Sequence, residues 1–341
     1  MSYIPREVPE GAIRYNTDSN KMEVYIGSTW MEVAVSSPTL DGGTRGLAIG
    51  GNIQPGGVTN KIDFINIASA GNAQDFGDMV SGLFASAGMS SRTRAVISGG
   101  RQTPGNTSDI QYLTMASTGN TIDWGVNPLN SLSYGSGAVS NQTRGITMGG
   151  YNTSNSRLDD IQFLTIASLG TINDFGNISA TRGYVSSVNS PTRGLANGGT
   201  QPAQVNTIEF ITIASTGNAQ DFGDLTVFGY RSGGCMSSTR GLIAFGETPA
   251  GDGQKNIDFV TMATLGNAAN FGDLTVGGQH PVGTSDSVRG VWLGRQNQSP
   301  YDDNEVIDYV NIATQGDAVD FGNLTAGTSM PASASTGHGG L

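Results

Sequence analysis

The sequence is poor in the side chains on which most catalytic and metal sites depend. Its 341 residues include one cysteine, Cys235, and two histidines, His280 and His338. A single cysteine excludes an internal disulfide framework. Two histidines argue against a Ser-His-Asp or Cys-His catalytic site and against a histidine-based metal site. We therefore expect neither a metal nor a cofactor.

Positive charge is also scarce. Lysine and arginine number 17 against 28 acidic residues, which gives a net charge of −11. Such a surface repels phosphate backbones and anionic membranes. No stretch is long and apolar enough to span a bilayer, and "MSYIPREVPEG" at the start lacks the apolar core of a signal peptide. We expect a chain that is made in the cytoplasm, binds no nucleic acid and does not insert into membranes.

Internal repetition, in contrast, is abundant. The phrase "NAQDFGD" stands at 72–78 and again at 218–224, and looser copies share its aromatic residue. These aromatic residues recur every 47 to 51 positions: Phe76, Trp124, Phe175, Phe222, Phe271 and Phe321. An arginine recurs with the same period: Arg45, Arg94, Arg144, Arg193, Arg240 and Arg289. A fixed period of this length indicates six tandem structural units.

Each unit predicts four short strands and no helix. The "IDFINIAS" type (62–69) is β-branched and apolar, the "RGLAIGG" type (45–51) ends in turn-forming glycines, "DFGDL" supplies a short strand or turn, and a Ser/Gly-rich strand precedes each arginine. Four strands in each of six units predict a six-bladed β-propeller. We expect the C-terminal segment 328–336 to pair with the first unit and close the ring, with residues 31–41 as the alternative.

The order of these motifs resembles the kelch repeat. An apolar strand ending in Gly-Gly is followed by a strand with an aromatic residue and then by an aromatic residue in the last strand. The resemblance extends from residue 44 to the C-terminus. Two units depart from it, because Phe245 and Arg295 each replace one glycine of the pair.

Residues 10–33 do not share the repeat and predict a three-stranded meander of "AIRYN", "KMEVYIG" and "WMEV". A module this small needs outside support, from the propeller, a partner or copies of itself. We therefore divide the chain into an N-terminal module (1–40) and a propeller (41–341).

The segment Gly11–Val33 is similar to a short module of bacteriophage virion proteins, especially tail fibres and related appendage proteins. In that family the module lies near the attachment end, ahead of a variable distal domain. The resemblance implies a virion component that contacts other virion proteins through this module, and no catalytic residue carries over. The module's candidate attachment residues are Arg14, Tyr15, Tyr25 and Trp30.

The recurring residues allow a functional and a structural interpretation. The six arginines could capture an anion or a glycan carboxylate, or they could bond carbonyls or acidic neighbours such as Asp63. The "DFG" phrase could bind calcium through pairs such as Asp75 with Asp78 and Asp221 with Asp224, or it could form a turn whose aromatic residue packs. Regular recurrence in every unit favours the structural interpretation of both.

If the repeats are a scaffold, function is expected in the loops where they differ. The segments that follow the glycine pair vary most, at 52–60, 101–109, 151–160, 200–206, 247–256 and 295–305. All follow the same strand and so emerge on one face. Their amides, hydroxyls and aromatic rings suit a glycan or a protein surface. The candidate binding residues are Arg101, Tyr151, Asn152, Gln201, Arg295, Gln296 and Tyr301.

These features predict a non-enzymatic virion structural protein, a tail-fibre or appendage component that presents a propeller face for host recognition. One alternative is a decoration protein of the capsid or of an internal joint. Another is a carbohydrate-active propeller enzyme, since spacing leaves paired carboxylates open. We expect no enzymatic activity.

Overall fold

The protein is described from a computed structural model, for residues 8–17, 21–32, 44–127, 134–168, 170–247, 253–297 and 302–341. The chain divides into two compact units, Met1–Leu40 and Asp41–Leu341. In the smaller unit, β1 (Ile13–Asn16), β2 (Lys21–Ile26) and β3 (Thr29–Glu32) form an antiparallel meander in that order. Gly27 and Ser28 connect β2 to β3, both with positive φ, as a tight two-residue hairpin requires.

The larger unit is built of antiparallel four-stranded sheets, and its described residues contain no helix. We number these sheets I to VI. Sheet I contains β31 (Ala332–Ser335), β4 (Arg45–Ile49), β7 (Lys61–Asn66) and β8 (Gln74–Asp78). Sheet II contains β9 (Ala87–Ser90), β10 (Arg94–Arg101), β11 (Asn106–Thr114) and β12 (Ile122–Val126). Sheet III contains β13 (Gly137–Ser140), β14 (Arg144–Met148), β15 (Leu158–Thr165) and β16 (Asn173–Arg182).

The remaining sheets repeat this order. Sheet IV contains β17 (Ser186–Asn189), β18 (Arg193–Asn197), β21 (Thr207–Thr212) and β22 (Gln220–Asp224). Sheet V contains β23 (Gly233–Met236), β24 (Arg240–Ala244), β25 (Gln254–Thr261) and β26 (Ala269–Gly278). Sheet VI contains β27 (Val282–Ser285), β28 (Arg289–Gln296), β29 (Asp303–Asn311) and β30 (Val319–Asn323). Two short hairpins, β5 (Asn52–Ile53) with β6 (Gly57–Val58) and β19 (Thr200–Gln201) with β20 (Ala203–Gln204), lie outside these sheets.

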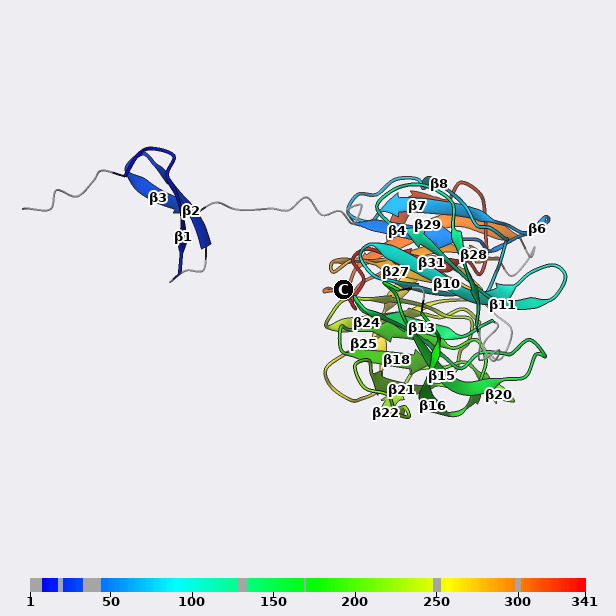
Figure 1. The fold of residues 1–341 in the computed structure, drawn as a ribbon. Helices are drawn as coiled ribbons and strands as arrows, with labels where there is room; N and C mark the ends of the chain where they lie inside the picture. Colours follow the sequence, from blue (N-terminus) through cyan, green and yellow to red (C-terminus); the bar gives the residue numbers. More distant parts are fainter. Residues whose placement is uncertain are drawn as a thin grey trace, which may run out of the picture. The chain divides into compact units, whose positions relative to one another are not determined.

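The Ser/Gly-rich strand comes first in every sheet, followed by the arginine strand, the "IDF" strand and the "DFG" strand. We call the first strands the inner strands: β31, β9, β13, β17, β23 and β27. Inner strands of successive sheets contact one another, and β27 contacts β31. The β5–β6 and β19–β20 hairpins project from one side of the unit, whereas the C-terminus lies on the opposite side (Figure 1). The fold is therefore all-β and propeller-like.

The C-terminal segment pairs with the first repeat, as the sequence predicted. Strand β31 lies antiparallel to β4, with Ala332 opposite Ile49 and Ser335 opposite Gly46. Because β4 is paired on its other side with β7, its backbone groups are satisfied along both edges. Most of the alternative segment, residues 33–41, lies outside the described residues.

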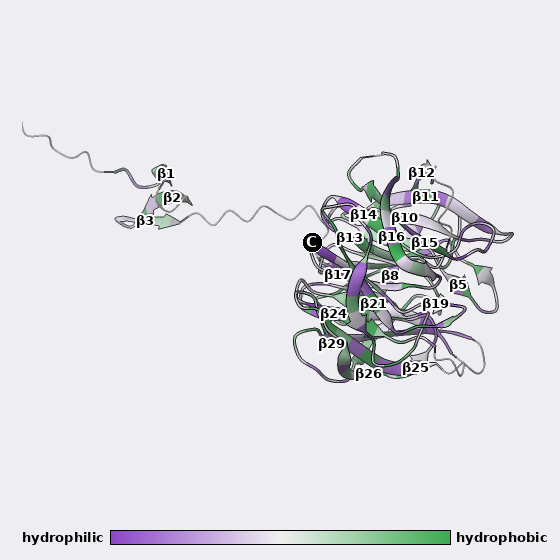
Figure 2. Ribbon diagram, turned by 90° about the horizontal axis from the view of Figure 1, so that it is seen from below, coloured by the Kyte–Doolittle hydropathy of each residue, from purple (hydrophilic) through white to green (hydrophobic). Residues whose placement is uncertain are grey.

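The hydrophobic core lies between the sheets. Phe222 of sheet IV, for example, packs in one cluster with Leu195 and Ile208 of its own sheet and with Ile243 and Val260 of sheet V. Equivalent clusters join the other successive sheets, and one joins sheet VI to sheet I. Figure 2 shows hydrophobic segments alternating with hydrophilic ones in the sheets of the larger unit. A sheet in this protein is stable only beside its neighbour.

The "DFG" phrase connects one unit to the next. The amide of Gly266 donates to the carbonyl of Phe222 at 2.9 Å, and the amide of Asp224 donates to Oδ1 of Asn267 at 3.0 Å. Gly223 adopts φ +148°, and a Cβ at this position would lie 2.5 Å from the carbonyl oxygen of Gly266. Glycine is required here because the neighbouring backbone occupies the space of a side chain. The same contact recurs at five of the six junctions, which explains why the phrase repeats.

The junction between sheets II and III departs from the pattern. Trp124 replaces phenylalanine, and Thr171 stands where other units carry Asn or Asp. The Trp124 indole N–H instead donates to the carbonyl of Gly170 at 3.4 Å. Trp124 is consequently half-buried, whereas the five phenylalanines are buried.

Replacing Phe222 by Ala should lower the free energy of unfolding by roughly 3–5 kcal/mol, because the ring is 2 % exposed between two sheets. Thermal and denaturant unfolding would measure the change. Phe228→Ala is the matched control, since that ring is 53 % exposed. Equal destabilisation by the two variants would contradict the inter-sheet role of Phe222.

Candidate functional site

The six repeat arginines lie at the junctions between sheets. The guanidinium of Arg193 donates to the carbonyl of Met262, in sheet V, at 2.8 Å and lies 4.6 Å above the ring of Phe210. The other five arginines make the same pair of contacts, and Arg289 of sheet VI reaches the carbonyl of Ile67 in sheet I at 3.1 Å. These cations are engaged with protein backbone and do not surround a common ligand position.

Arg193→Ala should destabilise the protein by about 1.5–3 kcal/mol, because it removes a charged hydrogen bond that joins two sheets. Chemical denaturation would measure the loss. Arg92→Ala serves as the control, since Arg92 is exposed and lies in the turn that precedes β10, two residues before the repeat arginine Arg94. A negligible change for Arg193→Ala would show that the ring contact and carbonyl bond contribute little.

The polar second position of each "IDF" strand is buried and bonded to the preceding sheet. Asp63 accepts from the amide and hydroxyl of Thr325, and Asp258 accepts in the same way from Thr226. Burial raises the pKa of Asp258 above its usual value, although the bonds from Thr226 oppose the shift. These carboxylates hold the connections between sheets. Within the part of the chain that the structure describes, no group of three or more His, Cys, Asp or Glu side chains is positioned to hold a metal ion.

Arg295 corrects the expectation that it lies on a binding loop. Pairing between β28 and β29 continues past the bulge at Leu293, with Arg295 opposite Asn304. The side chain is fully buried, and its Nη2 donates to Oδ2 of Asp308 at 2.7 Å. Arg295 is therefore an internal ion-pair partner that no ligand on the surface can reach.

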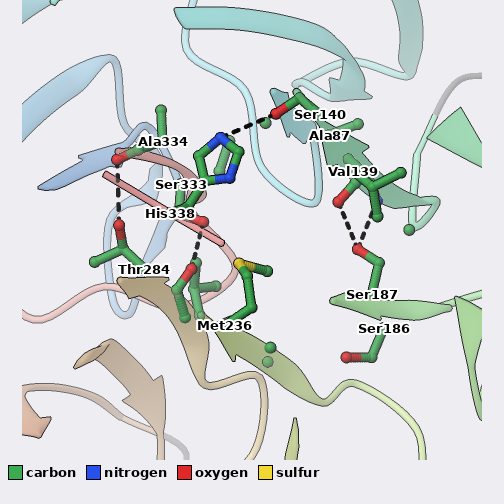
Figure 3. Close-up of a pocket in the computed structure, with 18 of the residues that line it drawn as sticks. Ala87, Val139, Ser140, Ser186, Ser187, Met236, Thr284, Ser333, Ala334 and His338 are labelled. Atoms are coloured by element: carbon green, nitrogen blue, oxygen red, sulfur yellow. Dashed lines mark hydrogen bonds between the residues drawn. The ribbon is translucent and has the colours of Figure 1, made fainter. Parts of the chain in front are cut away.

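The inner strands surround a cavity of about 160 Å³, lined largely by serine, glycine and alanine. We call it the inner-strand cavity. Figure 3 shows His338 beside Ser140, Met236 and Thr284, which come from three different sheets. The imidazole Nε2 lies 3.2 Å from Ser140 Oγ and 3.1 Å from the carbonyl of Ser90. Nδ1 accepts from the amide of Gly340, so the ring is neutral with its proton on Nε2.

Acid should destabilise the protein through His338. Burial lowers the pKa of this imidazole to about 4, whereas an unfolded histidine titrates near 6.5. The unfolded state therefore takes up the proton first, and stability is lost as the pH falls from about 6.5 to 4, by roughly 3 kcal/mol. Unfolding of wild type and His338→Gln across this range would measure the loss, which should be smaller in the variant. Parallel pH profiles would contradict the assignment.

A second cavity, of about 110 Å³, lies at the N-terminal ends of the inner strands and shares Ser86, Ser136 and Ser232 with the first. We call it the mouth cavity. Six residues, one just before each inner strand, line this cavity at equivalent places in the repeat, and we call these places the mouth positions. They are Ala85, Gly135, Tyr184, Arg231, His280 and Met330. All six have positive φ, between 51° and 65°.

Tyrosine side chains gather beside the mouth cavity. Tyr134 and Tyr151 stack with ring centroids 4.7 Å apart, and Tyr184 meets both rings edge-on. Tyr184 also lies near Tyr230, at 5.9 Å, and His280, at 6.0 Å. The cluster therefore spans sheets III to VI, and it has no counterpart in the repeat pattern.

Arginines cover the edges of this tyrosine cluster. Arg231 lies 5.2 Å above Tyr184 and pairs with Glu247 at 2.8 Å. Arg101 lies 5.1 Å above Tyr134, and Arg157 lies 5.8 Å above Tyr151. Burial is the main cause that raises the pKa of Tyr134, which keeps its hydroxyl protonated at neutral pH. The mouth thus combines aromatic rings with cations on a chain of strongly negative charge.

Two of the candidate loop residues from the sequence belong to this cluster, Arg101 and Tyr151. Short bridges join a residue at the start of a variable loop to the residue just before one of the six mouth positions: Phe84 with Arg101, Tyr134 with Tyr151, and Gln279 with Gln296. Gln296 is half-buried beside this face. The loop face and the mouth cavity therefore coincide.

Other candidates serve their own loops or lie elsewhere. Asn152 Oδ1 accepts from the amides of Ser154 and Ser156 and so organises its turn. Gln201 is half-buried in the β19–β20 hairpin. Tyr301 lies outside the described residues. The sequence did not identify Tyr134, Tyr184, Arg231 and His280 as candidate binding residues. For the last three a signal was present, because the amino acid just before each Ser/Gly-rich strand differs from unit to unit.

The meander presents two different faces. Its pairing places Ile13, Tyr15, Met22 and Met31 on one face, and each of these side chains is more than 40 % exposed. On the other face, Arg14 bonds Glu23 at 2.7 Å and lies 4.1 Å above Trp30, which packs against Tyr25. The four candidate attachment residues are therefore divided, because Tyr15 belongs to the apolar face.

No protein-family model matches the chain, and the search of curated proteins found no match. Among the described residues, no helix has the length and apolarity needed to cross a bilayer.

Proposed function

We propose that sheets I to VI are the blades of a closed, six-bladed, kelch-like propeller. The contacts of sheet VI with sheet I support closure: Phe321 packs with Ile65 and Ile67, and Arg289 bonds the carbonyl of Ile67. Pairing of β31 with β4 ties the C-terminal segment into the first sheet, which leaves this sheet four-stranded like the others. In a closed ring the inner-strand cavity is the central channel.

We propose that the protein is a non-enzymatic structural component of a bacteriophage virion, part of a tail fibre or similar appendage. The propeller presents its loop face for binding a host-surface glycan or protein. The observation that carries this proposal is the cluster of tyrosines and arginines at the mouth cavity, since it breaks the repeat on the face where the variable loops lie. Aromatic and arginine side chains are enriched at binding sites.

The N-terminal module attaches the protein to another virion protein in this proposal. Its resemblance to tail-fibre modules supports the assignment, and so does its exposed apolar face. A contiguous apolar surface on a module too small for its own core favours a partner.

Gold-labelled antibody against this protein on intact particles tests the location. We expect label at tail or fibre tips. Label over the head would favour a decoration protein, and absence of label would contradict the virion assignment. Turnover of glycans by the purified protein, abolished by replacement of one acidic residue, would favour the enzyme alternative.

The double variant Ile13→Ser and Met31→Ser should prevent incorporation into particles, because it makes the apolar face of the meander polar. Immunoblots of purified particles would measure incorporation. The control is Ile122→Ser with Val126→Ser, which removes two similarly exposed apolar side chains from the larger unit. Normal incorporation of the meander variant would argue against attachment through this face.

A further inference from the structure

We propose that the mouth cavity and the tyrosine cluster beside it form a binding site for an acidic saccharide, with Tyr184 and Tyr151 contacting the sugar rings and Arg101 and Arg157 contacting a carboxylate. Tyr134 is buried beneath Tyr151 and supports that ring from below. This inference rests on the proposed function, because it names the ligand class of the same face. It adds a specific site and a charge preference.

The left-handed backbone at the mouth positions indicates that the side chains there have a role. Seven described residues other than glycine have positive φ, and five of them occupy the mouth position: Ala85, Tyr184, Arg231, His280 and Met330. Left-handed backbone is unfavourable for residues with a Cβ. The chain uses glycine at most other positive-φ positions and at the equivalent position 135. Retention of Tyr, Arg and His here, despite that strain, points to a role for the side chains.

The cations that flank the cluster are available to a ligand. The guanidinium groups of Arg101 and Arg157 form no hydrogen bond or ion pair within the part of the chain that the structure describes, and they lie over the rings of Phe84, Tyr134 and Tyr151. The six repeat arginines, in contrast, all bond backbone carbonyls. A guanidinium that lies over a ring keeps N–H donors at its edge, and a carboxylate can accept two of them.

Unused polar groups also line the cavity. The hydroxyls of Ser86 and Ser232 are buried and find no partner among the described residues. The imidazole of His280 is 5 % exposed, lines the cavity and forms no hydrogen bond with described residues. It is neutral, because burial and the nearby Arg231 lower its pKa well below 6.5, so it offers one donor and one acceptor. Hydroxyl-rich ligands match such groups.

A saccharide fits these features better than a nucleic acid or an apolar peptide. Tyrosine rings provide flat apolar faces with polar edges, which suit a sugar ring. The net charge of −11 repels polyanions over the surface as a whole, so attraction is confined to the mouth. The cavity of about 110 Å³ admits part of one sugar unit, and the rest of the chain would lie across the loops.

The test uses an array of neutral and uronic-acid-containing oligosaccharides with the full-length protein, followed by calorimetry on the ligands retained. We expect binding of acidic members, weakened by added salt. Tyr184→Gly should reduce affinity at least tenfold, and the protein should remain folded because glycine accepts the left-handed backbone and offsets part of the lost ring packing. Arg101→Gln should reduce affinity for the acidic ligand about tenfold and leave any binding of its neutral analogue unchanged.

Ser28→Gly is the matched control, since it also places glycine at a left-handed position, φ 68°, but in the N-terminal unit and outside the cavity lining. It should bind as wild type does. Failure to bind any acidic oligosaccharide, equal binding of neutral ones, or unaltered binding by both variants would overturn the inference. Gold label at the fibre tips combined with a failure to bind acidic saccharides would overturn this inference and leave the proposed function intact. Binding of acidic saccharides without label at the tips would support this inference and contradict the proposed location in the virion.

Discussion

The structure of the larger unit depends on packing between neighbouring sheets. Each sheet has only four short strands, and its apolar side chains are covered by the next sheet in the chain. Burial of this shared surface supplies most of the stability, since burying apolar area is the dominant favourable term in folding. Every other recurring feature, including the arginine, the aromatic residue and the glycine of "DFG", acts at the same boundary.

This dependence explains why the repeat conserves its polar residues as strictly as its apolar ones. The junction must satisfy backbone groups that would otherwise be buried without partners. The arginine covers a carbonyl of the next sheet, and the Asn after the glycine of the next unit accepts a backbone amide. The buried carboxylate of the "IDF" strand accepts from the preceding connection. Orientation between sheets is thereby fixed by directional bonds, and burial supplies the driving force.

In a scaffold held together in this way, residues that lie outside the contacts between sheets can differ from one repeat to the next. The mouth positions lie at the starts of the inner strands, outside the inter-sheet clusters. Their backbone conformation is the same in all six sheets, yet their side chains differ completely. The N-terminal meander is the other place where the chain departs from its repeat, and there an apolar face is left without a cover in the unit itself.

The sequence by itself determined the repeat period, the four-stranded content of each unit and the pairing of the C-terminal segment with the first unit. These features follow from local patterns, because strand alternation and turn residues act over a few positions and recur at a fixed spacing. The sequence also named Arg101 and Tyr151 as loop residues, and both belong to the tyrosine cluster. It placed Arg295 on a loop, whereas continued pairing of β28 with β29 directs that side chain to buried Asp308.

Only the tertiary structure decided which residues meet at the mouth. Tyr134, Tyr151, Tyr184, Tyr230 and His280 lie up to 146 positions apart in the sequence, and the repeat period alone does not show that their side chains meet. They converge because successive sheets place equivalent positions around the same cavity, and because left-handed backbone at the mouth position lines that cavity with these side chains. Propensity and periodicity describe neighbours along the chain, whereas a binding site depends on neighbours across sheets.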